Sequence, residues 1–257
     1  MSTGRLSAVA VLAGHEVRRL WVQPWSWGLL AGTLALLSYF FLLSLDGFLA
    51  LSTKLAAATD APGVTDLIAV PLLRTLSNLQ LLLVPLLTMR VIAGERRQHS
   101  LTLLLSAGIG NSGIVVGKWL ACLGYLIVLL TLTAAMPLAL AGGANLDFGK
   151  LAVVFVAIAF ESAALCAIGV LASSWTAQPV LAAALALALN LLLTVLDAGA
   201  RLQGVSNSAI NYLALPTHLE PAFRGVLASV DLGYFALVTM VCLTLATQRV
   251  DALRSAD

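Results

Sequence analysis

Six long runs of apolar residues constrain this sequence more than any other feature. One of them, LLAGTLALLSYFFLLSL, begins at Leu29. A helix of about 20 apolar residues crosses the ~30 Å hydrocarbon core of a bilayer, and continuous runs lack the alternating pattern of a β-barrel. We therefore expect an all-α polytopic membrane protein, with six transmembrane helices in a single domain over residues 1–257. The expected spans are about 26–45, 68–92, 114–140, 151–172, 178–198 and 230–248.

The low charge content excludes a soluble globular protein. Only 10% of the 257 residues are charged and 60% are hydrophobic. A soluble domain carries about 25% charged residues, because its whole surface faces water. A chain with so few charges needs lipid as the solvent for most of its surface.

The distribution of Lys and Arg predicts the orientation, because these residues gather in the cytoplasmic loops of membrane proteins. An N-terminus in the cytoplasm places nine of the 14 Lys and Arg residues on the cytoplasmic side. We therefore expect both termini in the cytoplasm. Residues 94–113 then form a cytoplasmic loop, and residues 199–229 form an extracytoplasmic loop.

Residues 1–25 are expected to form an elbow helix that lies in the membrane interface. Their apolar residues recur at i, i+3 and i+4 spacing and Trp residues follow, a pattern typical of interfacial amphipathic helices. The alternative is a solvated cytoplasmic arm. The apolar stripe consists of Leu6, Val9, Ala10, Ala13, Val17 and Leu20.

The densest charge cluster of the chain is the stretch ERRQH at residues 95–99. A helix through this stretch places Arg97, Leu101 and Leu104 on one side. Glu95 stands at its start, where a carboxylate complements the helix dipole. We expect a short surface helix that either lies in the headgroup layer or docks into a groove of a partner.

The stretch around this cluster, MRVIAGERRQHSLTLLLSAGIGNSGIVVGKWLA at residues 89–121, resembles the signature of ABC-2-type transporter permeases. Residues 167–190 and 223–240 resemble two further stretches of that family, in the family's order. The last stretch and the short first outside loop are most similar to the gliding-motility and nitrous-oxide-reductase-maturation permeases. Thr102 departs from the pattern, because the family has an acidic residue there. The signature matches at Met89, Arg90, Glu95, Arg96, Arg97, Leu101, Leu104, Leu105, Gly117 and Lys118.

The resemblance implies the membrane subunit of an ABC exporter in the bacterial cytoplasmic (inner) membrane. It implies two partners, a nucleotide-binding (ATPase) subunit that carries ATP and Mg, and a second permease subunit in a homodimer or a related heterodimer. It also implies that the 94–113 loop contains the coupling helix that contacts the ATPase. The residues expected in this contact are Glu95, Arg96, Arg97, Ser100, Leu101, Leu104 and Leu105.

A second function stays open at this point. A membrane component of this type transmits force to an extracytoplasmic partner protein without moving a solute. Neither function involves nucleic acid, and no spacing of His or Cys indicates a metal site.

The chain is not expected to hydrolyse ATP or to bind a cofactor itself. A phosphate-binding loop needs G-x-x-x-x-G-K-[ST] after a strand. The nearest stretch, from Gly113 to Lys118, is one residue too short between its glycines and lies in an expected membrane helix. We expect Lys118 to extend to the inner headgroups instead.

Glu161 lies about midway along the fourth expected span. A carboxyl group at this depth is costly, and it marks a polar path or a contact between helices. Three interpretations remain: a residue that lines the translocation path, a hydrogen bond to a neighbouring helix through Thr131, Thr133 or Ser162, or span boundaries that place Glu161 near an interface.

Gly28 and Gly32 form a G-x-x-x-G pattern in the first span, which permits close contact between membrane helices. In the family that this chain resembles, the first and fifth spans form the dimer contact. The resemblance therefore places these two glycines in a dimer contact.

Overall fold

The computed structural model describes residues 14–55, 63–97, 110–202 and 212–254. It confirms the expected fold class, because six of the described helices are long and apolar enough to cross a membrane. The described residues contain no strand. The six helices are α2 (Pro24–Leu55), α3 (Val70–Thr88), α6 (Asn111–Leu138), α7 (Phe148–Trp175), α8 (Pro179–Leu202) and α11 (Ser229–Arg254).

Short helical elements join or extend the long helices. Residues 14–22 are helical ahead of α2. The others are the π-helix η1 (Thr65–Ala69) before α3, α4 (Ala93–Arg97) after α3, the 3₁₀ helix η2 (Ala139–Gly142) after α6, and α10 (Leu215–Phe223) before α11.

Local sequence explains where several helices begin and end. Pro179 lies in the first turn of α8, where the missing N–H of proline leaves no helical hydrogen bond unmade. Asp147 caps α7 by accepting a 3.0 Å hydrogen bond from the backbone N of Lys150. Gly225 follows α10 with φ +89°, a conformation that favours glycine.

The first long helix runs past its expected end. α2 continues through Asp46 to Leu55, whereas the sequence predicted a span that ends at about 45. The apolar run does stop near Asp46, but the next proline is Pro62. A helix can continue from the hydrocarbon core into the headgroup and water layers, so the apolar run underestimates its length.

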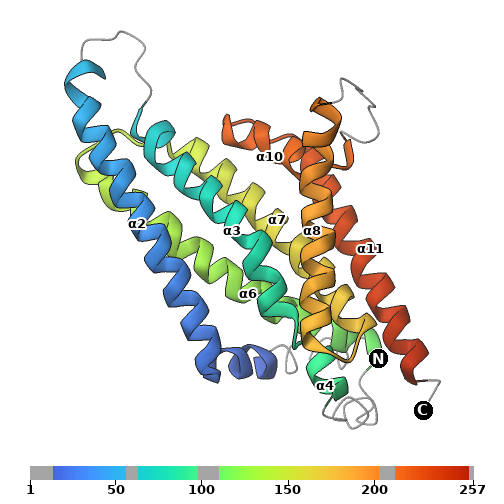
Figure 1. Cartoon of the computed structure of the whole chain (residues 1–257). Helices are drawn as coiled ribbons and strands as arrows, with labels where there is room; N and C mark the ends of the chain where they lie inside the picture. The colour runs from blue at the N-terminus through green and yellow to red at the C-terminus, as the bar shows by residue number, and fades with distance from the viewer. Residues whose placement is uncertain (1–13, 56–62, 98–109, 203–211, 255–257) are drawn as a thin grey trace, which may run out of the picture.

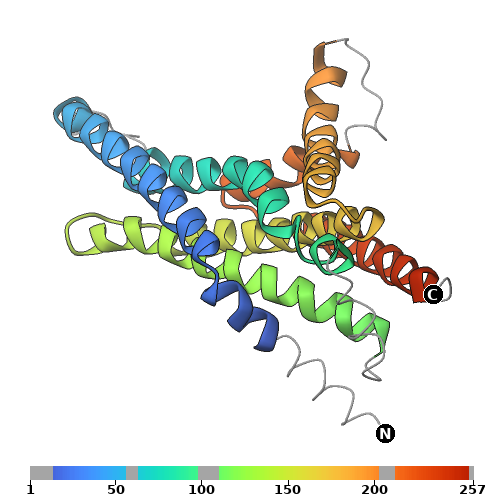
Figure 2. The ribbon, with the colours of Figure 1, turned by 60° about the horizontal axis from the view of Figure 1, so that its bottom comes forward.

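α7 lies at the centre of the bundle and contacts α3, α6, α8, α10 and α11 (Figure 1). Its Val154, Ile158 and Leu165 are fully buried in the main apolar core. α3 contacts both α2 and α8, which lie on either side of it in Figure 2. α2 and α8 therefore form the outer parts of the protomer.

Different helical elements lie at the two ends of the bundle. Residues 14–22, α4 and the end of α11 lie at one end, which we call the α4 end (Figure 1). α10, η1 and the start of α7 lie at the other, the α10 end (Figure 1). At the α10 end, the Thr65 hydroxyl accepts a 2.9 Å hydrogen bond from the backbone N of Asp147, which joins η1 to α7.

Candidate functional site

The α4 helix is held against the end of α7 by hydrogen bonds. The backbone N–H groups of Ile92 and Ala93 both donate to the Ser173 hydroxyl, at 3.1 and 3.0 Å. The Arg96 guanidinium donates to the Ser174 carbonyl at 3.1 Å. Ser173 and Ser174 are fully buried, so the start of α4 is fixed to the most buried helix of the bundle.

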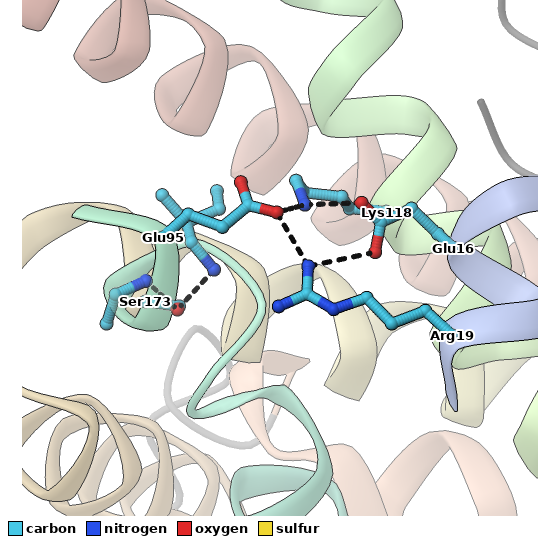
Figure 3. Close-up of polar contacts among 7 residues, drawn as sticks. Glu16, Arg19, Glu95, Lys118 and Ser173 are labelled. Carbon is cyan, nitrogen blue, oxygen red and sulfur yellow. Dashed lines mark hydrogen bonds and ion pairs between the residues drawn. The ribbon is translucent and has the colours of Figure 1, made fainter. Parts of the chain in front are cut away.

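Glu95 is the centre of an ion-pair cluster on the other side of α4 (Figure 3). Its Oε1 lies 2.5 Å from Lys118 Nζ and 2.9 Å from Arg19 Nη1. Glu16 completes the cluster, 2.8 Å from Lys118 and 3.8 Å from Arg19. We call these four residues the α4 ion cluster. The cluster connects the 14–22 helix, α4 and α6.

Three of the four residues of the α4 ion cluster are buried although they are charged, and the side chain of Arg19 is 39% exposed. Glu95 is 3% exposed, Glu16 8% and Lys118 1%. Buried charges are tolerated when opposite charges and hydrogen bonds compensate the loss of water. Two carboxylates and two cations meet this condition. The expectation that Lys118 extends to the headgroups is therefore wrong, because the two carboxylates hold its ammonium group inside the protein.

The far end of the 94–113 loop is also attached to the bundle. Asn111, the first residue of α6, donates a hydrogen bond from its side chain to Asp251 near the end of α11. The loop is thus fixed to α7 and α6 where it begins and to α11 where it ends. The expected contact residues Ser100, Leu101, Leu104 and Leu105 lie outside the described residues.

The three described members of the expected ATPase contact are placed differently. Glu95 points into the α4 ion cluster, and Arg96 is bound to α7. Arg97 is exposed, and no ion pair joins it to another described residue. Among these three, Arg97 is the one whose charge faces away from the protomer.

Glu161 occupies a second polar site, near the middle of the bundle. It is 3% exposed, and its Oε1 accepts a 2.9 Å hydrogen bond from Ser77 of α3. Of the partners considered from the sequence, Thr131 and Thr133 instead bond their own helix backbone. Ser162 does so too, and it also donates to Gln80 of α3.

Sequence reasoning missed Ser77 as the partner of Glu161. The signal was the spacing of Ser77 and Gln80, two polar residues at i, i+3 in an apolar span. It also missed Glu16 and Arg19, which have the same spacing in the elbow segment. In each pair, two polar residues on one helix face predict a polar partner on a neighbouring element.

Gly28 and Gly32 lie on an exposed face of α2. A Cβ atom added at either glycine has no atom within 4 Å beyond its own helix neighbourhood. Within the protomer, therefore, close helix packing does not require either glycine.

The described residues contain no group of three or more His, Cys, Asp or Glu side chains placed to hold a metal ion.

Six helices that are long and apolar enough to cross a membrane define the chain as a multi-pass membrane protein. A family model described as ABC-2 family transporter protein matches residues 10–209. The chain therefore belongs to the ABC-2 transporter family, as a permease. No curated protein matches its sequence.

Membership in this family has two consequences. The chain is the membrane subunit type of the family, which is generally non-catalytic. Family membership also implies a lipid bilayer and an ABC ATPase subunit as partners.

Proposed function

We propose that this permease is half of an ATP-driven exporter in a bacterial inner membrane, with the α4 end and both termini in the cytoplasm. A separate nucleotide-binding subunit carries ATP and Mg and docks on the 94–113 loop. The proposal is supported by family membership and by the concentration of Lys and Arg in the segments at the α4 end.

The attachment of the loop at both ends is the observation that carries this proposal. A force applied by the ATPase moves the bundle only where the loop is fixed to the spans. Ser173 and the α4 ion cluster fix its beginning, and the Asn111–Asp251 hydrogen bond fixes its end. Displacement of the loop then moves α6, α7 and α11 together.

Two permease subunits form the complete transporter, either as a homodimer or as a related heterodimer. The exposed α2 face around Gly28 and Gly32 supports this, because small residues allow close approach of a second chain. In the same proposal Glu161 lines the translocation path, since it is a buried carboxyl group beside a cavity.

Co-purification tests the proposal. A photo-crosslinking residue is placed at Arg97, the permease is isolated from native membranes, and the crosslinked chain is identified by mass spectrometry. We expect a subunit with a complete phosphate-binding loop, and Mg-dependent ATP hydrolysis by the complex. The control crosslinker is placed at Asp46, an exposed residue in the second half of α2, away from the α4 end. Absence of such a subunit at Arg97, together with normal behaviour of Arg97 variants, would contradict the proposal.

The same preparation distinguishes export from force transmission. A solute that stimulates ATP hydrolysis in the reconstituted complex supports export. A stable crosslink from residues 199–229 to an extracytoplasmic protein, without any solute dependence, supports force transmission instead.

A further inference from the structure

A cavity of about 90 Å³ lies next to Glu161, between α3, α7, α8 and α10. Its polar lining comes from Arg74, Ser77 and Asn78 of α3, Glu161 of α7, Thr194 of α8 and Glu220 of α10. Its remaining walls are largely aliphatic and aromatic side chains of α3 and α10. A single water needs roughly 10–15 Å³ of such space, so the cavity holds several waters or a small polar group.

Glu161 presents an unused acceptor in this region. Its Oε1 is bonded by Ser77, but its Oε2 is buried and has no hydrogen-bond partner among the described residues. A buried carboxyl oxygen without a partner costs roughly 1–3 kcal/mol, and more when the group is charged. A hydrogen-bond donor that reaches the Glu161 carboxylate removes this cost.

The only cation that lines the cavity, in the described part of the chain, is already paired. Arg74 lies 2.9 Å from Glu220 of α10, and its guanidinium stacks over the Phe223 ring at 4.3 Å. These contacts join α3 to α10 at the α10 end of the cavity. Arg74 pairs with Glu220, which also lies 3.8 Å from Arg224, so Glu161 is the acidic group of the described lining that no cation pairs with, and it favours a cation over an anion.

We propose that this cavity binds the ammonium group of a hydrophobic amine, with Glu161 as its counter-ion and hydrogen-bond acceptor. The inference rests on the proposed export function and names its substrate class. The ammonium N–H groups donate to the Glu161 carboxylate, and the apolar part of the amine lies against Leu219 and Phe223 of α10, which line the same cavity. α10 covers the cavity, held in place by the Arg74–Glu220 pair.

Direct binding of octylamine to the purified permease in phosphatidylcholine nanodiscs tests this proposal. Radiolabelled octylamine is titrated by scintillation proximity, and its binding to empty nanodiscs is subtracted. We expect saturable binding to the unchanged protein, at least about tenfold weaker binding to Glu161→Gln, and no competition by octyl sulfate. Asp46→Asn is the matched control. It removes one acidic charge from an exposed position on α2 and is expected to leave octylamine affinity unchanged.

A second variant tests the location of the site independently of Glu161. Thr194→Leu adds bulk to the cavity wall without altering a charge, and it is also expected to weaken octylamine binding at least about tenfold. Saturable octylamine binding that both variants retain at full affinity overturns the proposal, as does an absence of saturable binding to the unchanged protein. Competition by octyl sulfate equal to that by unlabelled octylamine also overturns it, because the site is then not selective for cations.

The experiment separates this inference from the proposed function. Binding is measured on the permease alone, so a failure to find an ATPase partner leaves the octylamine result intact. Conversely, a permease that associates with an ATPase but does not bind octylamine retains the proposed export function and loses only this substrate class.

Discussion

Lys118 Nζ lies 2.5 Å from Glu95 Oε1 inside the protein, although the two residues are separated by the whole 98–109 segment and by the first two turns of α6. The contact joins the start of the expected coupling loop to the helix that follows it. This ion pair holds the beginning of the loop against α6, and its removal is the first prediction.

Lys118→Met is expected to destabilise the protein by about 3–5 kcal/mol, because it leaves Glu16 and Glu95 buried without their ammonium partner. Equilibrium unfolding in mixed micelles measures the change. Arg18→Met is the control, since Arg18 is exposed on the same elbow helix as Glu16, and we expect it to stay within about 0.5 kcal/mol of the unchanged protein.

The double variant Glu95→Gln/Lys118→Met checks the cause of this loss. It removes both members of the pair, so its destabilisation should be smaller than the sum of the two single variants. Additive losses would contradict the assigned interaction between the two side chains.

Arg97→Glu is expected to weaken association with the ATPase subunit at least about tenfold while leaving stability within about 0.5 kcal/mol. Its side chain is exposed, so reversal of its charge affects a partner and not the protomer. Glu95→Gln should instead lower the stability of the permease and leave its association with the ATPase largely unchanged, because this carboxylate is bound within the protomer. The measurements are thermal unfolding of each permease variant and quantitative pull-down of the ATPase. Equal effects of both variants on both measurements would argue against a division of roles.

Gly28→Leu and Gly32→Leu test the dimer contact on α2. Both positions are exposed, and a Cβ atom added at either meets no atom within 4 Å beyond its own helix neighbourhood, so folding and monomer stability should not change. If this face contacts a second permease, the larger side chains prevent close approach of the helices and shift the protein towards monomers. Single-molecule photobleaching in liposomes gives the proportion of dimers. Gly47→Leu, at another unobstructed α2 glycine beyond the first expected span, is the control.

Gly169→Ala should destabilise the protein by about 1–3 kcal/mol through overpacking. Gly169 of α7 packs against Thr88 of α3, and a Cβ at residue 169 overlaps the Thr88 hydroxyl and comes within 2.8 Å of Thr88 Cβ. Adding Thr88→Ala should recover only part of the loss, because the Cβ of residue 88 remains. Gly124→Ala on α6 is the control, since no atom lies within 4 Å of the added methyl group. Equal unfolding midpoints for Gly169→Ala and Gly124→Ala would exclude this close packing.

The resemblance in the 89–121 stretch predicted the family, and the described part of this stretch shows which of its residues have internal roles. Glu95 and Lys118 are both in the signature, but their pairing was not expected. The signature is linear, and it cannot state which of its residues contact one another. The surface role of Leu101 and Leu104 remains a prediction, because both lie outside the described residues.

The sequence by itself determined the class of fold and the approximate positions of the spans. Membrane insertion depends on the summed hydrophobicity of about 20 consecutive residues, which is a local property of the chain. The ends of the helices were less well predicted, as α2 shows, because a helix can continue beyond the apolar run that spans the membrane.

Only the tertiary structure decided which polar residues meet. Lys118 pairs with Glu16 and Glu95, and Glu161 bonds to Ser77, across separations in sequence that no periodicity connects. These contacts depend on which helices lie side by side and on how each is rotated about its axis. Burial then forces each charged or polar group to find a partner among the few that the packing brings near.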